Sequence, residues 1–252
     1  MPEYPLFDAH FHIIDPRFPL VPNRGYLPDR YTINDYQERL KDYDLKGGVV
    51  ISGSFQAFDQ DYLVDALSRL GPAYAGVTQL PATVTDEELL ELDNAGVRAV
   101  RFNLKRGGSE SVKHLDSMAR RVHEQVGWHV ELYADAKDLQ ELYPILVALP
   151  AVSIDHLGLS TAGLPTLLAL AEKGVRVKAS GFGRVDFDVP TALKNLYAAD
   201  PDCLMFGTDL PSTRAARPYT DRDFQLLIDT LGEKAATQVC YTNAINFYRI
   251  RD

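Results

Sequence analysis

The chain has 252 residues, of which 46% are hydrophobic and 24% charged, and its formal net charge is −9. This composition excludes a disordered chain, and a chain of this length buries about three-quarters of its unfolded surface, so it folds without disulfides or a structural metal. The acidic balance argues against nucleic acid and against an anionic membrane surface as partners.

Short apolar runs alternate with segments of helical periodicity from one end of the chain to the other. The apolar runs predict eight strands, at 5–12, 46–52, 74–80, 97–104, 128–134, 151–157, 175–180 and 203–209. The helical pattern covers 34–44, 60–70, 85–96, 111–127, 138–149, 164–174, 190–200, 220–232 and, as one further amphipathic helix, 235–250. A capping box at Thr85 and Glu88 and a glycine at Gly127 mark helix boundaries.

This alternation predicts an α/β fold with a parallel sheet, because parallel neighbours need long crossover connections. The even strand count and the length favour a closed (β/α)8 barrel, the TIM barrel, over an open doubly wound sheet. The glycine-rich motifs that bind dinucleotides or phosphates are absent from the sequence. We therefore expect residues 1–252 to form a single barrel domain with an extra C-terminal helix.

Other features predict a soluble, cytoplasmic protein. The start, MPEYPLFDAHFHI, lacks the regions of a signal peptide, and no run reaches the ~18 apolar residues of a membrane span. Cys203 and Cys240 lie in apolar contexts and are expected to be buried free thiols. The sequence leaves the oligomeric state open, a homo-oligomer included.

Candidate catalytic residues lie at the ends of three expected strands. The first strand ends in His10 and His12, the sixth in His156 and the eighth in Asp209. In a barrel, catalytic groups lie at the carboxyl ends of the strands, and alternation along the first strand puts both of its histidines on one face, with Phe11 opposite. Imidazoles and a carboxylate that converge in this way suit a divalent metal or an acid–base site that activates water.

The alternative to a functional role for these residues is a structural one. A single histidine at a strand end is more often a structural hydrogen-bond partner than a catalyst, and H-x-H motifs arise by chance. Four such groups from three strands, all at the face where sites form, favour function. We therefore predict His10, His12, His156 and Asp209 as catalytic residues, and as the ligands if a metal is bound.

The stretches FDAHFHI, IDHLG and FGTDLP resemble the amidohydrolase superfamily over nearly the whole chain. A finer resemblance is to its lactonase branch, and within that branch to the 2-pyrone-4,6-dicarboxylate lactonases. The segments that carry this finer resemblance are 17–28, 100–108 and 180–184. It implies that the substrate and its carboxylates are bound by Tyr26, Arg101, Arg106, Tyr133 and Arg184.

The chemistry of arginine supports an anion site independently. Arg101 lies on an otherwise apolar strand, where a buried guanidinium is costly without an anion, and guanidinium groups bind carboxylates with two hydrogen bonds. Two alternatives stay open: Arg101 pairs with Glu131 on the next strand, and Arg106 is a solvated surface residue. Ser54 and Gln56 follow the second expected strand and are further candidates for substrate binding.

Three other polar residues lie near these candidates. Asp8 shares the face of His10 but sits deeper, so we expect it to orient a ligand histidine. His129 begins the fifth strand, at the end of the barrel away from the site, and is expected to be structural. Asn103 shares the face of Arg101, and its role is left open.

Together these observations predict a carboxylic ester hydrolase that opens a small anionic lactone, such as 2-pyrone-4,6-dicarboxylate or a muconolactone. Asp209 takes a proton from the attacking water, and the three histidines, with or without one Zn²⁺ or Mn²⁺, polarise the carbonyl. The resemblance implies a metal-independent enzyme, whereas the donor set can form a mononuclear Zn²⁺ site. The alternatives are a sugar-acid lactonase, isomerase or decarboxylase of the same superfamily, or a non-catalytic barrel that binds carboxylates.

Overall fold

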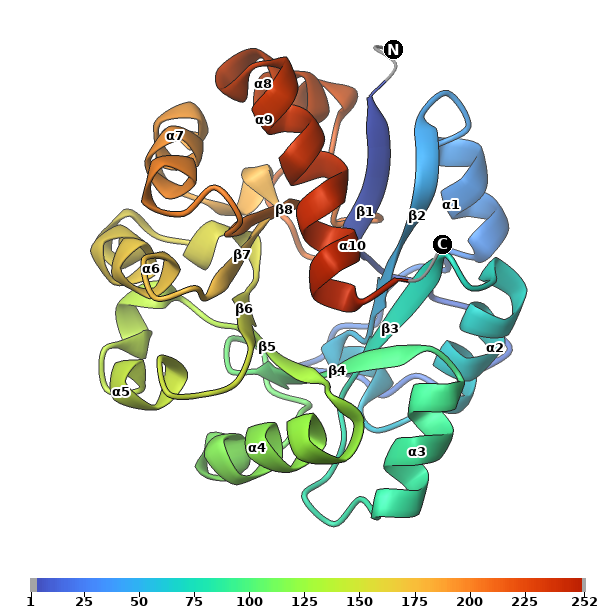
Figure 1. Ribbon diagram of the computed structural model, residues 1–252. Helices are drawn as coiled ribbons and strands as arrows, with labels where there is room; N and C mark the ends of the chain where they lie inside the picture. Colours follow the sequence, from blue (N-terminus) through green and yellow to red (C-terminus); the bar gives the residue numbers. More distant parts are fainter. Residues whose placement is uncertain (1–3, 251–252) are drawn as a thin grey trace.

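The computed structural model of the protein describes residues 4–250, and within this range eight parallel strands form one sheet in sequence order (Figure 1). They are β1 (Pro5–Phe11), β2 (Asp44–Ile51), β3 (Tyr74–Thr78), β4 (Val97–Asn103), β5 (His129–Tyr133), β6 (Val152–Ile154), β7 (Arg176–Ala179) and β8 (Leu204–Phe206). Each overlaps a predicted strand, and the predicted barrel is confirmed. β6 and β8 are shorter than predicted, because the chain turns into loops before His156 and Asp209.

The helices lie outside the strands (Figure 1). They are α1 (Ile33–Arg39), α2 (Asp61–Leu70), α3 (Asp86–Asn94), α4 (Leu115–Val126), α5 (Tyr143–Leu146), α6 (Leu164–Ala171), α7 (Val189–Ala199), α8 (Asp221–Leu231), α9 (Glu233–Thr237) and α10 (Asn243–Tyr248). The helix predicted at 138–149 is wrong in extent: Pro144 stands in the first turn of α5, which spans only 4 residues. The predicted C-terminal helix is divided by a π-helical turn at Gln238–Thr242.

The barrel closes between β1 and the loop that follows β8. The backbone N–H of Asp209 donates to the carbonyl of His10 at 2.7 Å, and that of His12 donates to the carbonyl of Leu210 at 2.8 Å. Gly207 permits this approach, because a Cβ atom there would lie 2.6 Å from the backbone nitrogen of His10. Closure of the barrel therefore fixes the predicted catalytic residues of β1 relative to Asp209.

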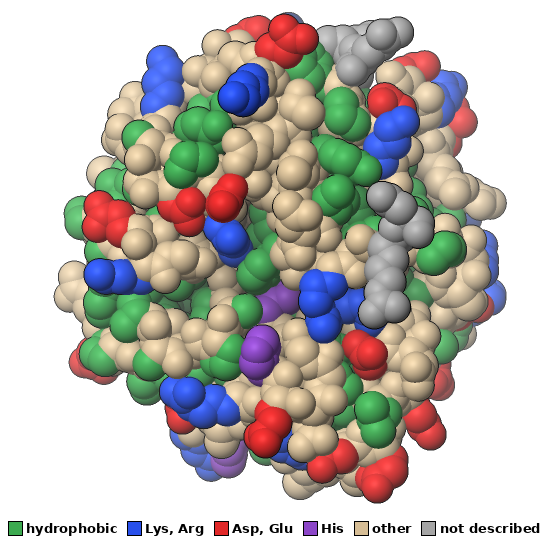
Figure 2. Space-filling view, viewed as in Figure 1, with side chains coloured by type: hydrophobic (Ala, Val, Ile, Leu, Met, Phe, Trp, Pro, Cys, Tyr) green, Lys and Arg blue, Asp and Glu red, His purple; other side chains and the backbone are tan. Residues whose placement is uncertain are grey.

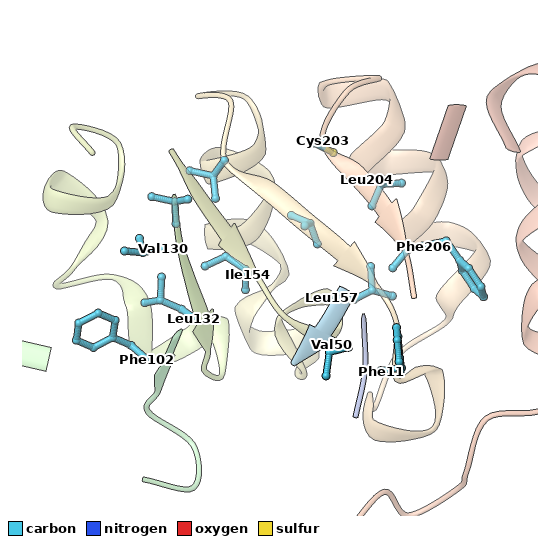
Figure 3. Close-up of a cluster of buried hydrophobic side chains, with 14 of the residues drawn as sticks. Phe11, Val50, Phe102, Val130, Leu132, Ile154, Leu157, Cys203, Leu204 and Phe206 are labelled. Carbon is cyan, nitrogen blue, oxygen red and sulfur yellow. The ribbon is translucent and has the colours of Figure 1, made fainter. Parts of the chain in front are cut away.

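The main hydrophobic core lies between the strands and the surrounding helices. Figure 3 shows part of it, with Phe102 of β4, Leu132 of β5, Ile154 of β6 and Phe206 of β8 in one cluster. A second cluster, which includes Tyr248 of α10, fills the amino-terminal end of the barrel. That end is therefore filled with apolar side chains, and the opposite end is left for polar groups.

Figures 1 and 2 are drawn from the side on which α10 lies. Acidic and basic side chains are scattered over this face among apolar ones, with no large area of one sign (Figure 2). Cys203 and Cys240 are buried free thiols, as predicted. None of the helices within residues 4–250 has the length and apolar character that crossing a membrane requires.

Candidate active site

Three histidines surround one carboxylate oxygen at the carboxyl end of the barrel. The Nε2 atoms of His10, His12 and His156 lie 3.9, 3.9 and 3.8 Å from Oδ1 of Asp209. All four residues are at most 4% exposed. The structure thus brings together the four side chains that the sequence placed at the ends of three separate strands.

Two of these residues occupy a backbone conformation that side chains other than glycine rarely adopt. His156 has φ 51° and Asp209 has φ 61°, in the loops that follow β6 and β8. Such conformations cost free energy and persist where the surrounding structure enforces them, which happens often at functional sites. Here the conformations turn both side chains toward the histidines of β1.

Each histidine is held through the ring nitrogen that faces away from Asp209. Nδ1 of His12 lies 2.7 Å from the carbonyl oxygen of Ile51, which only accepts, so Nδ1 carries the proton and Nε2 offers a lone pair. Nδ1 of His156 lies 2.9 Å from the hydroxyl of Ser180, which both donates and accepts. Nδ1 of His10 lies 3.5 Å from a carboxylate oxygen of Asp155. Metal-binding histidines are commonly oriented by partners of this kind.

Burial keeps the imidazoles uncharged. It lowers the pKa of His10, although the charge of Asp155 acts in the opposite direction. Burial lowers the pKa of His12 and of His156 well below the ordinary value, and a proton on His10 would lower both further. The three rings are therefore neutral at neutral pH, which is the form that binds metals.

The donor set fits one divalent metal. Nε2 of His10 and Oδ1 of Asp209 are buried and find no hydrogen-bond partner among residues 4–250. His10, His12 and Asp209 form one group whose ligand atoms all lie within 4.8 Å of one another, and His10, Asp155 and His156 form a second. Lone pairs that converge without a hydrogen between them repel, so a cation or shared protons must neutralise them.

A network of buried charges underlies the histidines, and sequence reasoning missed most of it. Arg101 donates to Oδ2 of Asp155 from Nε at 3.1 Å and from Nη2 at 2.7 Å. Glu131 instead accepts from Lys178 at 2.5 Å, so the predicted alternative of an Arg101–Glu131 pair is wrong. Lys178 also lies 3.7 Å from Asp155 and 3.4 Å from Nδ1 of His10. A lysine inside the apolar run VRVKAS was the signal that could have revealed it.

Two other polar residues of the barrel have structural roles. Asp8 accepts hydrogen bonds from the backbone and hydroxyl of Thr208, from Tyr36 and from the backbone N–H of His10. It therefore holds the junction of β1 and β8 and contacts the main chain of His10, not its ring. His129 lies 3.0 Å from Glu131, away from the site, as predicted.

A pocket lies above the histidines at the carboxyl end of the barrel. Among the residues that line it are predicted substrate-binding residues and one arginine that was not predicted: Ser54, Arg101, Arg106, Tyr133, Arg184 and Arg214. The space left between these side chains is about 30 Å³, room for one or two water molecules, so a larger ligand has to displace side chains at the mouth. A larger groove of about 700 Å³ lies beside Tyr74 and Gly96 at the amino ends of β3 and β4, at the opposite end of the barrel.

Arg184, predicted to hold a substrate carboxylate, pairs with the predicted general base. Its Nε donates to Oδ2 of Asp209 at 2.6 Å, and its Nη2 donates to the carbonyl of Thr213 at 2.8 Å. One oxygen of Asp209 is thus occupied, and the other faces the histidines.

Two predicted substrate-binding residues do not line the pocket directly. The amide of Gln56 is used within the loops, since Oε1 accepts from the backbone of Gly53 at 2.7 Å and Nε2 donates to the carbonyl of Ile13 at 2.8 Å. The ring of Tyr26 packs against the guanidinium of Arg214, 4.2 Å from its carbon. The structure therefore places Tyr26 at the mouth and gives Gln56 a structural task.

Comparison with known proteins agrees with this geometry. A family model described as "Amidohydrolase" matches residues 7–250. A 2-pyrone-4,6-dicarboxylate hydrolase of Comamonas testosteroni is 35% identical over 162 residues, which are 60% of this chain and 51% of that protein. A 4-sulfomuconolactone hydrolase of Rhizobium radiobacter is 25% identical over 81% of this chain and 75% of its own length.

Two further similarities cover more of both chains. A D-galactarolactone isomerase of Agrobacterium fabrum is 25% identical over 89% of this chain and 83% of its own length. A crystal structure from Agrobacterium tumefaciens superimposes with a TM-score of 0.88 over 99% of this chain and 98% of that one, at 21% identity, and shows the same fold. This chain spans about half the length of the Comamonas protein.

Proposed function

Because this chain belongs to the amidohydrolase family, we propose that it is an enzyme that hydrolyses a lactone bearing carboxylates. The observation that carries the proposal is the environment of Oδ1 of Asp209, which has no hydrogen-bond partner among residues 4–250. Three imidazole nitrogens face this oxygen at 3.8–3.9 Å beneath an arginine-lined pocket. Two of the relatives are, by name, hydrolases of lactones that carry anionic groups.

Asp209 is the general base in this proposal. Arg184 occupies Oδ2, so Oδ1 is the oxygen free to take a proton from water. The water oxygen bonds to the lactone carbonyl carbon as its proton passes to Asp209. The bond between that carbon and the ring oxygen then breaks, and the ring oxygen takes up the proton, which leaves a hydroxy acid.

The histidines have different tasks because their outer partners differ. The carbonyl of Ile51 fixes the proton of His12 on Nδ1, so Nε2 acts only as an acceptor or a ligand. The hydroxyl of Ser180 also permits the other tautomer of His156, in which Nε2–H donates to the developing oxyanion. A bound Zn²⁺ or Mn²⁺, held by His10, His12 and Asp209, would lower the pKa of water and polarise the carbonyl.

The arginines supply binding and orientation. Arg101 is neutralised by Asp155, but its guanidinium still lines the pocket with Tyr133 against it, 5.3 Å from the ring centre. Arg184 can exchange Asp209 for a substrate carboxylate, which would release Asp209 when substrate arrives. Asp209 would then be released from Arg184 only when a substrate is bound in the pocket.

The test is an assay on purified protein with a panel of carboxylated lactones, with and without added Zn²⁺ or Mn²⁺. Ring opening is followed by loss of the lactone absorbance and by identification of the acid product. We expect turnover of at least one dicarboxylated lactone. A panel left intact under every metal condition contradicts the proposal.

A second candidate is a sugar-acid lactone isomerase, which the alignment with D-galactarolactone isomerase over 89% of this chain favours. The two reactions differ in product. Hydrolysis consumes one water and gives an open acid, whereas isomerisation gives another lactone of the same mass. Nuclear magnetic resonance of the product mixture distinguishes them.

A further inference from the structure

Two arginines at the mouth of the pocket differ from the deeper arginines in their partners. Asp155 neutralises Arg101 and Asp209 neutralises Arg184, both through buried contacts. Arg106 and Arg214 are half-buried in the pocket wall, and neither pairs with a carboxylate in the part of the chain that the structure describes. The uncompensated positive charge of the pocket therefore lies at its mouth.

Arg214 is held in place by uncharged groups. Its Nη1 donates to the side-chain oxygen of Asn23 at 2.9 Å, its Nη2 donates to the backbone oxygen of the same residue, and its guanidinium stacks on Tyr26. A guanidinium has five N–H donors, so about three remain for a ligand. The side chain is thus oriented but not neutralised, which is what binding an anion requires.

Asn23 joins the two mouth arginines. Its Nδ2 donates to the carbonyl of Arg106 at 3.3 Å while its Oδ1 accepts from Arg214, so it connects the loops that follow β1, β4 and β8. Arg106 and Arg214 line the same pocket, where like charges repel, and burial and then the charge of Arg106 lower the pKa of Arg214. An anion between them would relieve this repulsion.

We infer that Arg214 is a substrate-binding residue that, with Arg106, holds an anionic group on the outer end of the substrate, and that Asn23 is its positioning residue. The identity of the substrate as a lactone rests on the proposed function, but the anion subsite does not. Arg214 lies five residues beyond Asp209 in the same loop, so it connects recognition at the mouth with the base at the floor.

The inference is tested by calorimetric titration with benzene-1,3-dicarboxylate and with benzoate, neither of which contains a ring ester. We expect the wild type to bind the dicarboxylate more tightly. Arg214→Met should weaken the dicarboxylate about 10- to 100-fold, the usual range for lost hydrogen bonds to a charged group, and benzoate less than 3-fold. Arg217→Met is the matched control, since Arg217 lies in the same loop but pairs with Asp223 at 2.7 Å.

A second variant tests the mechanism without removing the arginine. Asn23→Asp places a carboxylate where Arg214 now meets a neutral amide, so it should weaken the dicarboxylate about as much as Arg214→Met does. Equal binding of the two ligands by the wild type, or Arg214→Met binding the dicarboxylate within 3-fold of wild type, overturns the inference. Neither result bears on whether the protein hydrolyses a lactone. If the protein hydrolyses no lactone, the titration still tests the anion subsite.

Discussion

Asp155 neutralises the cations beneath the active site, and its replacement tests the buried network directly. The side chain is fully buried, with Arg101 on Oδ2 at 2.7 Å and Lys178 and His10 near Oδ1 at 3.7 and 3.5 Å. Burial alone would raise the pKa of Asp155, but Arg101 and then the other cationic groups hold it well below its ordinary value. Two cations and two anions, Glu131 being the second, thus balance inside the barrel.

Asp155→Asn keeps the shape of the side chain but leaves one buried positive charge uncompensated. Breaking a buried pair from one side costs roughly 3–5 kcal/mol, a large share of the ~5–15 kcal/mol that stabilises a typical domain. For a chain of this size each kcal/mol lowers Tm by about 2–4 °C, so we expect a decrease of roughly 6–20 °C. Asp116→Asn is the control, because its partner Arg120 is exposed and such pairs contribute about 1 kcal/mol or less.

The assay is urea and thermal unfolding at pH 7, followed by circular dichroism. It compares Asp155→Asn, Asp116→Asn, Arg101→Met and the double variant Arg101→Met with Asp155→Asn. Removing both partners should restore part of the lost stability, since the uncompensated charge is then gone. The reasoning is refuted if Asp155→Asn loses no more stability than Asp116→Asn, or if the double variant is as unstable as the sum of the two single ones.

Three further predictions concern the same core. In Gly181→Ala the new Cβ would lie 2.7 Å from Nδ1 of His156 at a φ of +60°, so turnover should fall at least about 10-fold. Gly174→Ala is the control, because the space around Gly174 is open, and it should leave turnover within 2-fold. Equal turnover in the two variants contradicts this geometry. Burial alone would raise the pKa of Glu131, but Lys178 and His129 lower it from 4.5 to about 2, so its stabilisation is present above pH 4.5 and lost as pH falls from 4.5 to 2. Between pH 4.5 and pH 2 the unfolding free energy of Glu131→Gln should therefore fall by up to ~3 kcal/mol less than that of the wild type. An equal fall in the two proteins counts against this prediction. Purified protein should bind about one Zn²⁺ or Mn²⁺ per chain by elemental analysis, and His12→Ala should lower this content at least several-fold; a metal content that His12→Ala leaves unchanged excludes that ligand set.

The sequence predicted the fold because the alternation of strands and helices extends through the whole chain. The capping box at Thr85 and Glu88 begins α3, and Gly127 ends α4 in a left-handed conformation, both as expected. The convergence of His10, His12 and Asp209 was also predictable, since strand ends of a barrel share one face. These features depend on local pattern and on topology, which a sequence carries.

Side-chain partners were less predictable, because they depend on reach as well as on register. Arg101 and Glu131 stand opposite each other in the β4–β5 ladder, yet Arg101 extends to Asp155, which follows β6, while Lys178 of β7 reaches past β6 to Glu131 on β5. Arg214 lies in an irregular loop, where no periodicity places a side chain. Only the folded loops show that it meets Asn23 and Tyr26.

The most direct test of this mechanism uses the variant Asp209→Asn. It measures the turnover of a carboxylated lactone by this variant and the affinity of the variant for benzene-1,3-dicarboxylate. Loss of the base should lower kcat about 10²- to 10⁴-fold, while the dicarboxylate should bind at least as tightly as to the wild type, because Arg184 loses its competing carboxylate. Turnover by Asp209→Asn within 3-fold of wild type would contradict the central assignment of Asp209 and its three histidines as the site of hydrolysis.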